Sequence, residues 1–279
     1  MLIIKDIVNL QAYLKTYKLN NEKIGFVPTM GGLHEGHGNL IKSSQENNDK
    51  TIVSIFLNPK QFNNIEDLKR YPVNKGDDYD YCLKNKIDII FEPNEYEIYP
   101  LNYKLIKNNF FQNILCDKFR PGHFDGVVSV VSELFKIIEP SNAYFGYKDY
   151  QQFKIIDQLA KKKFSKIIIK GVETVRDAMG LAFSTRNNLL NSNSKEIYSK
   201  FIFNMKNFIN SLDSGLENST ANNLVRDFIK DTNTGIGKFD YHEFRSDPDL
   251  SLKGTINDSR FFLAFYLNST RLIDNFKID

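Results

Sequence analysis

Two of the four histidines in the sequence lie in one short segment, FVPTMGGLHEGHGNL, at residues 26–40. His34 and His37 stand three positions apart, among four glycines, a proline and a carboxylate. At this spacing near the start of a helix, both imidazoles can face one phosphate group. Their N–H donors would stabilise charge that builds on the phosphate as it is attacked. The segment therefore indicates a phosphate-binding corner that acts by positioning and electrostatics.

The residues around the histidine pair are typical of a strand-loop-helix turn. Pro28 and the Gly31-Gly32 pair end an apolar run, Gly36 permits close backbone approach, and His37 is expected to open the next helix. Such a turn directs free backbone N–H groups at an anion. The sequence has no GxxxxGK[ST], and no GxGxxG follows this strand.

Other interpretations of the histidine pair stay open on spacing alone. HEGH differs from the HExxH zinc pattern and no third ligand is near, which disfavours a metal site. A histidine at such a position is otherwise a helix cap or a surface residue. The motif therefore needs support from elsewhere in the chain.

The elements that must position this corner alternate between strands and helices. Residues 125–140 predict a helix with an aliphatic stripe opposite Ser129, Ser132, Glu133 and Lys136. Alternation of this kind predicts a parallel sheet with right-handed crossovers, whose ligands bind at the carboxyl ends of the strands. Strands are expected from apolar runs at residues 23–28, 51–57, 87–91, 142–146 and 166–171.

The texture of the sequence changes after about Glu173. Residues 187–212 predict a helix with a polar entry, and residues 237–250 and 260–275 predict a small antiparallel sheet or hairpin. We therefore expect a Rossmann-like domain over residues 1–173 and a smaller α+β domain over residues 174–279.

The charge balance excludes some partners. The 279 residues include 37 Lys and Arg against 34 Asp and Glu, so no strong field would recruit nucleic acid or an anionic membrane.

Cys82 and Cys116 have no CxxC spacing and are expected to be reduced core thiols. Charges interrupt the apolar N-terminus, so neither a signal peptide nor a membrane span is expected. We predict a cytoplasmic protein.

Segments along the whole chain resemble the pantoate–β-alanine ligase family and occur in the same order. The resemblance implies an HxGH-type nucleotidyltransferase sheet domain with a C-terminal lid domain. The matching segments are VPTMGGLHEGH, SIFLNPKQFNNIEDLKRYP, RPGHFDGVVSVVSELF, FGYKDYQQFKIID, TVRDAMGLAFSTRNNLL, YHEFRSDPDL and TRLIDNF.

The resemblance implies an AMP-forming acid–amine ligase of pantothenate biosynthesis. Its substrates would be pantoate, β-alanine and ATP, with Mg²⁺ as cofactor, and the enzyme would be a homodimer. The pantoate carboxylate would attack the α-phosphorus of ATP, releasing pyrophosphate, and the β-alanine amine would then displace AMP. Water must be kept from the reactive anhydride, which favours a closed pocket between the two domains.

The resemblance also implies which residues bind ATP. His34 and His37 would contact phosphate, with His37 the proton donor, and Lys148 would add a positive charge. Val175 would present its backbone to adenine, and the loop at residues 183–186 would close on the phosphates. Catalytic roles fall on His34, His37, Lys148, Ser184 and Arg186. The full ATP set is Met30, Gly31, Gly32, Leu33, His34, Glu35, Gly36, His37, Gly146, Tyr147, Lys148, Asp149, Val175, Phe183, Ser184, Thr185 and Arg186.

The remaining site residues would bind pantoate or β-alanine, or hold Mg²⁺. Simpler interpretations stay open: loop amides that bond their own backbone, a histidine or serine that caps a helix, a solvated Lys-Asp pair, and acids that complement a helix dipole. The substrate set is Asn58, Gln61, Arg120, His123 and Gln152, and the metal pair is Asp77 and Asp78.

The sequence departs from the family pattern at four positions. Tyr147 stands where a glutamate is usual, Met179 replaces an aspartate, Phe183 a methionine and Gly32 an alanine. Two rival functions remain: another HxGH adenylyltransferase, acting on nicotinate mononucleotide or phosphopantetheine, and a noncatalytic Rossmann-like module that binds nucleotide or RNA. The near-neutral charge argues against RNA.

Overall fold

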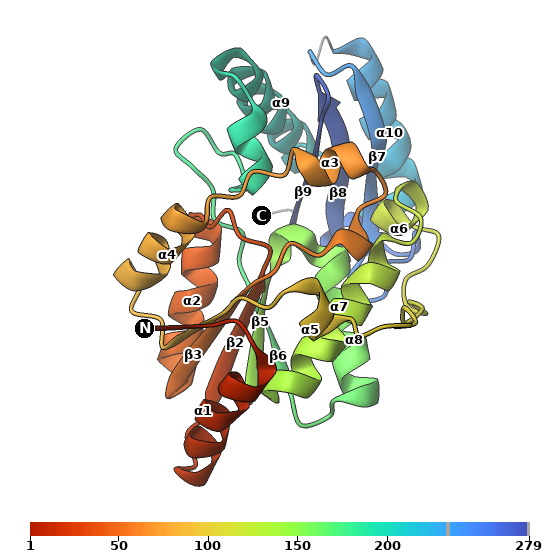
Figure 1. Cartoon of the computed structure of the whole chain (residues 1–279). Coiled ribbons are helices and arrows are strands. Elements are labelled where there is room, and N and C mark those ends of the chain that lie inside the picture. The colour runs from red at the N-terminus through yellow and green to blue at the C-terminus, as the bar shows by residue number, and fades with distance from the viewer. Residues whose placement is uncertain (233–234, 278–279) are drawn as a thin grey trace. The chain divides into compact units, whose positions relative to one another are not determined.

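The computed structural model describes residues 1–232 and 235–277. The chain forms two compact units, Met1–Val175 and Arg176–Asp279 (Figure 1). In the part of the chain that is described, no helix is both long and apolar enough to cross a membrane. Cys82 and Cys116 are buried and are not joined in a disulfide.

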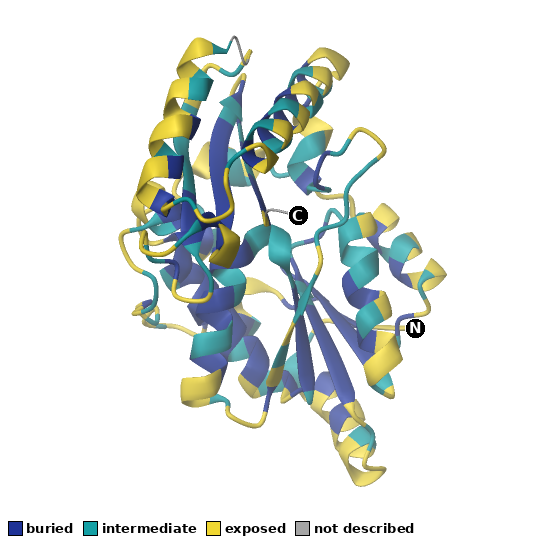
Figure 2. Ribbon diagram, turned by 180° about the vertical axis from the view of Figure 1, so that it is seen from behind, coloured by how far each residue is buried: buried dark blue, intermediate teal, exposed yellow. Residues whose placement is uncertain are grey.

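The first unit is built on a six-stranded sheet in which all neighbouring strands run parallel. The strand order is β1-β4-β3-β2-β5-β6. The central strands are buried along nearly their whole length, as befits parallel strands covered on both faces (Figure 2). The predicted α/β class is confirmed. The strands are β1 Leu2–Ile4, β2 Ile24–Thr29, β3 Lys50–Ile55, β4 Ile89–Phe91, β5 Asn142–Gly146 and β6 Ile168–Val172.

Helices flank this sheet on both faces, with α2 and α4 on one side and α7 and α8 on the other (Figure 1). Helix α1 packs on α7, and α7 packs on α8. The longer helices are α1 Ile7–Leu19, α2 Glu35–Asn47, α4 Lys75–Lys84, α7 His123–Ile138 and α8 Tyr150–Lys163. Short turns complete the connections: η1 Pro59–Gln61, α3 Ile65–Lys69, α5 Glu95–Ile98, α6 Leu115–Phe119 and η2 Tyr147–Asp149.

Helix α7 differs from its predicted amphipathic form. Ser129 and Ser132, expected on a polar face, are 0% and 1% exposed. The hydroxyl of Ser129 accepts the backbone N–H of Ile106 at 2.8 Å, so the segment before the helix passes over its predicted polar side. The Ser129 hydroxyl therefore satisfies buried backbone, and neither serine faces solvent.

The second unit joins a three-stranded antiparallel sheet, β7-β8-β9, to two helices. Tyr198 and Phe201 of α9 pack against Phe265 of β8 at ring separations of 5.1 and 5.5 Å, which seals the helix onto the sheet. The predicted antiparallel sheet is present, and α9 lies within the helix predicted over residues 187–212. A second helix, α10, lies where no range was predicted from the sequence. The elements are η3 Thr185–Leu189, α9 Ser192–Asn210, α10 Asn218–Asp231, β7 Lys238–Ser246, η4 Ile256–Asp258, β8 Ser259–Leu267 and β9 Thr270–Lys277.

Candidate active site

The strand order places a switch point between β2 and β5. Phe26 of β2 pairs with Ile52 of β3 on one side and with Ala143 of β5 on the other. The chain after β2 continues toward β3 and β4, whereas the chain after β5 continues toward β6. Loops that diverge in this way leave a crevice at the carboxyl ends of the strands, where ligands of such sheets bind. The segments at residues 30–37 and 146–149 begin at this crevice.

The carboxylate of Asp78 in α4 holds the glycine loop that follows β2. Gly31 and Gly32 adopt φ values of 84° and 63°, the left-handed region that favours glycine. Asp78 accepts the N–H of Gly32 at Oδ2 (3.0 Å) and that of Leu33 at Oδ1 (2.7 Å). Burial raises the pKa of Asp78, although these two N–H groups favour its charged form. Asp78 therefore shapes the loop.

His34 and His37 form a reciprocal cap at the start of α2. The ring Nδ1 of His34 accepts the N–H of Gly36 at 3.1 Å, and Nδ1 of His37 accepts the N–H of His34 at 3.3 Å. A backbone N–H can only donate, so Nδ1 carries no proton on either ring. A neutral imidazole in this setting has its proton at Nε2. The helix begins at Glu35, two residues earlier than predicted, with His34 as its cap.

The surroundings of the two rings keep both of them neutral at pH 7. Burial and, to a smaller extent, the charge of Lys148 together lower the pKa of His34 to about 4. Burial also lowers the pKa of His37 well below its ordinary value, and His34 and Lys148 act in the same direction. The ring centroids are 4.1 Å apart. The pair is thus suited to hydrogen-bond donation through Nε2–H, and a neutral ring is a poor acid for the role expected of His37.

Two backbone groups set the orientation of the Asn58 amide, a carbonyl that can only accept a hydrogen bond and an N–H that can only donate one. Its Nδ2 donates to the carbonyl of Gly126 (3.2 Å), and its Oδ1 accepts the N–H of Lys60 (3.2 Å). The buried hydroxyl of Tyr99 donates to the same oxygen at 2.8 Å. Nδ2 also donates to Oε1 of Gln61 at 3.0 Å. Asn58 is only 1% exposed and is therefore enclosed by protein. Its hydrogen bond to Oε1 orients the Gln61 side chain.

This arrangement determines which end of Gln61 faces outward. Its oxygen is occupied by Asn58, and its Nε2 lies 2.8 Å from the Met30 sulfur, at the edge of the glycine loop. A thioether is a weak acceptor that a ligand oxygen would readily replace. Gln61 therefore offers N–H donors, which recognise a carboxylate or hydroxyl oxygen.

Arg120 and His123 hold the backbone of the same glutamine. His123 is buried, and its Nδ1 donates to the Gln61 carbonyl at 2.8 Å. Arg120 Nη2 reaches that carbonyl at 3.4 Å, and its Nη1 lies 3.0 Å from His123 Nε2. Gly126 allows α7 and η1 to lie this close together, because a Cβ at this position would lie 2.4 Å from the Lys60 carbonyl. The cap of α7 is Gly122, so the helix-cap interpretation of His123 is wrong.

The second segment that is predicted to bind nucleotide follows β5. Lys148 Nζ lies 3.8 Å from the Asp149 carboxylate, so the ion pair is loose, and Asp149 is about half exposed. Tyr147 packs its ring on Phe153 at 5.0 Å and lies over Gly171, where a Cβ would come within 2.0 Å of the ring. Tyr147 thus contributes packing where the resemblance leads us to expect a charge.

Two adjacent glutamines of α8 have different surroundings. Gln151 is buried, accepts the N–H of Cys116 at 2.9 Å and donates to the carbonyl of Ile114 at 3.0 Å. Gln152 is half-buried and makes none of these structural contacts. Gln151 is thus committed to structure, and substrate binding by Gln152 stays a prediction.

Val175 ends the first unit and lines a cavity of about 530 Å³ together with Glu35 and Gly38 at the start of α2. The rest of the cavity wall comes from α2 and from α4 and its C-terminal end. A residue predicted to meet adenine and the helix predicted to meet phosphate thus border one hollow. This hollow is polar, with Lys42 and Lys84 on its wall.

The loop residues predicted to close on phosphate belong to the second unit. Ser184 caps η3, and its hydroxyl accepts the N–H of Arg186 at 3.3 Å. Thr185 is buried, whereas Phe183 and Arg186 are half-buried. The N-cap interpretation of Ser184 is therefore correct as local structure, and it leaves a role toward a ligand as a prediction.

The predicted metal pair lies in the first turn of α4. Asp77 accepts a hydrogen bond from Asn74 at 2.8 Å, and Asp78 is committed to the glycine loop. Within residues 1–232 and 235–277, no group of three or more His, Cys, Asp or Glu could hold a metal ion. The side chains do not fit a dedicated Mg²⁺ cage, and the predicted ligation by Asp77 and Asp78 stays a prediction. Mg²⁺ commonly binds through substrate phosphates.

A doubly wound sheet with capping histidines and a lysine at its switch point defines an α/β nucleotidyltransferase-like domain. The family model for pantoate-beta-alanine ligase matches residues 2–277. The chain belongs to the pantoate–β-alanine ligase family.

Curated relatives cover nearly the whole chain. The chain is 39% identical over 284 residues to the pantothenate synthetase of Aquifex aeolicus and 40% identical over 282 residues to that of Clostridium botulinum. In each case 99% of both chains is covered.

Solved structures agree. The ligase of Francisella tularensis, complexed with β-γ ATP and β-alanine, has a TM-score of 0.83 and 37% identity over 99% of this chain and 97% of that one. The Thermus thermophilus enzyme has a TM-score of 0.88 and 29% identity, covering 100% of this chain and 99% of that one.

Proposed function

We propose that this chain condenses pantoate with β-alanine at the expense of ATP, through a pantoyl adenylate. Membership of the ligase family supports the reaction, and the Francisella relative was crystallised with a form of ATP and with β-alanine. The observation that carries the proposal is the neutral histidine pair at the switch point. The Nε2 atom of each ring carries the proton and can donate a hydrogen bond.

In the first step, the pantoate carboxylate attacks the α-phosphorus of ATP and the bond to pyrophosphate breaks. The Nε2–H groups of His34 and His37 donate to α-phosphate oxygens, on which charge grows during the attack. Donors fixed in advance need no reorganisation as the reaction proceeds. The ammonium of Lys148 supplies positive charge from the second segment, and the Asp149 carboxylate suits a ribose hydroxyl.

Pantoate lies against Gln61 and Gln152 in this proposal. The outward N–H donors of Gln61 hold an oxygen of the acid and align its carboxylate for in-line attack. Asn58, Arg120 and His123 act indirectly by fixing the side chain and backbone of Gln61. Of the five residues predicted to bind substrate, two therefore contact pantoate directly in this proposal and three support Gln61.

Ser184 and Arg186 of the second unit contact the pyrophosphate that leaves. A hydroxyl and a guanidinium match the charge on that group, and such loops commonly close over a substrate. The second unit then acts as a lid that keeps water from the mixed anhydride. Mg²⁺ bound to the ATP phosphates would supply charge neutralisation there.

In the second step, the β-alanine amine attacks the acyl carbon and AMP leaves. We extend the proposal to a homodimer, as the family resemblance implies, and to the cytoplasm, the location predicted from the sequence. Sedimentation of the purified chain tests the dimer.

The decisive assay is pantoate-dependent exchange of pyrophosphate into ATP. Exchange that requires pantoate and proceeds without β-alanine supports the proposal. Exchange that requires nicotinate mononucleotide or phosphopantetheine instead would establish the adenylyltransferase rival, and no exchange with any acceptor would leave a nucleotide-binding module.

A further inference from the structure

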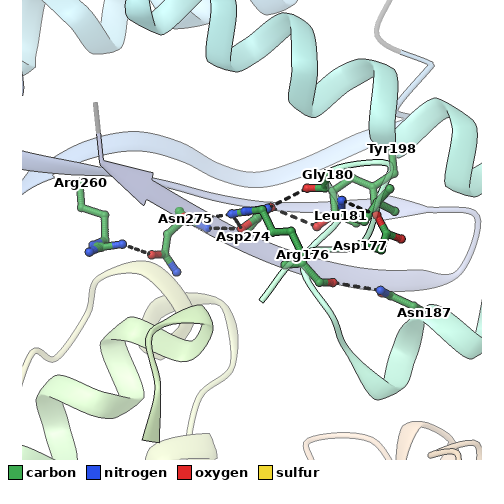
Figure 3. Close-up of polar contacts among 10 residues, drawn as sticks. Arg176, Asp177, Gly180, Leu181, Asn187, Tyr198, Arg260, Asp274 and Asn275 are labelled. Atoms are coloured by element: carbon green, nitrogen blue, oxygen red, sulfur yellow. Dashed lines mark hydrogen bonds and ion pairs between the residues drawn. The ribbon is translucent and has the colours of Figure 1, made fainter. Parts of the chain in front are cut away.

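One ion pair fastens the segment that carries Ser184 and Arg186 to strand β9 (Figure 3). Arg176 donates from Nη1 to Asp274 Oδ2 at 2.8 Å and from Nη2 to Asp274 Oδ1 at 2.7 Å. A guanidinium that meets both oxygens of one carboxylate fixes orientation as well as distance. The Asp274 side chain is 0% exposed and that of Arg176 is 18% exposed, so water screens the pair only weakly.

The same guanidinium organises the turn that follows. Arg176 Nη1 also donates to the carbonyl of Gly180 at 3.1 Å. Within the turn, Asp177 Oδ1 accepts the N–H of Leu181 at 3.0 Å, and Gly180 adopts a φ of 81°. The conformation of residues 177–181 thus depends on where Arg176 is held.

The turn is in contact with η3 through one further residue. Ala182 pairs with Arg176 in an isolated bridge, and its carbonyl accepts Nδ2 of Asn187 at 3.0 Å. Asn187 lies within η3, which Ser184 caps through the N–H of Arg186. A continuous set of hydrogen bonds therefore joins the β9 carboxylate to the segment that would bind phosphate.

Asp274 is itself immobilised. Its Oδ2 accepts the hydroxyl of Tyr198 at 3.3 Å, and its Oδ1 accepts the N–H of Asn275 at 2.8 Å. Burial and the nearby carboxylate raise the pKa of Tyr198 well above its ordinary value, so the hydroxyl stays a donor. The backbone of Asp274 is paired with Leu263 in the sheet.

We propose that Asp274 is a positioning residue for the ATP-dependent half of the reaction. Acting through Arg176, it holds residues 177–189 in the shape that presents Ser184 and Arg186 to the triphosphate. The identity of the ligand rests on the proposed function, whereas the fastening of the segment does not.

The test compares Asp274→Asn with a matched control. Asp240→Asn removes a carboxylate of similar burial, which Arg271 Nε contacts at 2.7 Å and which joins β7 to β9. Both variants lose an ion pair of the same sheet, and only the first loses the pair that fastens the segment. Arg176→Lys, which keeps the charge and loses the paired donors, serves as a second variant should Asp274→Asn fail to fold.

The first readout separates the two half-reactions. Asp274→Asn is expected to slow pantoate-dependent ATP–pyrophosphate exchange roughly tenfold to a hundredfold, because misplaced groups lose alignment. Amide formation from supplied pantoyl adenylate and β-alanine should proceed at the wild-type rate. Equal losses in both half-reactions, or the same loss of exchange in Asp240→Asn, would overturn the proposal.

The second readout needs no substrate. Backbone amides of residues 177–189 should exchange hydrogen faster in Asp274→Asn than in wild type or Asp240→Asn, and unchanged protection would also overturn the proposal. If the wild type shows no pantoate-dependent exchange, the proposed function fails, and hydrogen exchange still decides whether Asp274 fastens the segment.

Discussion

The Nδ1 atom of His37 accepts the backbone N–H of His34, and Nδ1 of His34 in turn accepts the N–H of Gly36. Each ring thus caps the helix with Nδ1, which leaves its proton on Nε2. The pKa values of both rings are lowered, so both rings stay neutral and keep Nδ1 unprotonated at neutral pH.

Replacing His37 should separate the capping role from the donor role. His37→Ala is expected to slow adenylation by roughly 10²- to 10³-fold, as loss of one preorganised donor does elsewhere. His37→Gln, whose amide nitrogen reaches about as far as Nε2, should recover part of that rate, and the shorter His37→Asn should not. Pyrophosphate exchange measures all three, and a wild-type rate for His37→Ala would exclude the role.

The stability of the protein without ATP should fall in acid because of His34. The pKa of His34 is about 4 when folded, against an ordinary value of 6.5, so the unfolded chain binds more protons between these values. Stability attributable to this group is therefore present above about pH 6.5 and is lost as the pH falls toward 4. Urea unfolding at pH 7 and pH 5 should show a smaller loss in His34→Gln than in wild type. An identical loss in both proteins would contradict the assigned pKa.

Tyr99→Phe should weaken pantoate binding without affecting ATP. The variant removes the hydroxyl that donates to Asn58 Oδ1, and the loss of one buried hydrogen bond costs about 1 kcal/mol. With Asn58 less constrained, Gln61 loses alignment, so the KM for pantoate should rise. Tyr103→Phe is the control, because its hydroxyl donates to Glu133 at 3.0 Å. Equal effects of the two variants on pantoate would argue against the relay.

Asp78→Asn distinguishes a loop support from a magnesium ligand. The asparagine would place an NH₂ against one of the N–H groups of Gly32 and Leu33, so the glycine loop should shift and the KM for ATP should rise. Because this defect lies in the loop, raising the Mg²⁺ concentration should not correct it. Recovery of ATP affinity at high Mg²⁺ would assign Asp78 to the metal instead.

Gly126→Ala should destabilise the first unit. Its Cβ would lie 2.4 Å from the Lys60 carbonyl, so α7 and η1 must move apart, at about 1–3 kcal/mol for such overpacking. At Gly146 a Cβ meets nothing within 4 Å, and φ is −77°, so Gly146→Ala should leave stability nearly unchanged. Denaturant unfolding compares the two, and similar midpoints would show that the close approach is not needed.

Much of this fold could be predicted because five apolar runs are bounded by clear turn residues. Strand β1 was missed because only three residues pair, and charged residues follow them directly. Helix α10 is hard to predict because its first six residues include three Asn and one Ser, which are poor helix formers. Its apolar positions, Ala221, Leu224, Val225 and Phe228, nonetheless have helical spacing and could have revealed it.

The site was predicted less completely, since sequence shows residue types but not their hydrogen-bond partners. Asn58 and Gln61 both carry amides, so the sequence does not distinguish their roles. In the structure Asn58 is enclosed, whereas Nε2 of Gln61 points at the Met30 sulfur. Tyr99 carries no motif signal and is separated from Asn58 by 41 residues. Asp274 lies in a recognised motif, but nothing in the letters links it to Arg176, 98 residues earlier.

Tyr147 and Gly171 constrain each other. The tyrosine ring fills the volume that any side chain at position 171 would need. Mutational drift at either position is therefore conditional: alanine at 171 becomes tolerable only once the ring at 147 has gone, and the two substitutions should be strongly non-additive. The identity of residue 147 therefore restricts which side chains position 171 can accept.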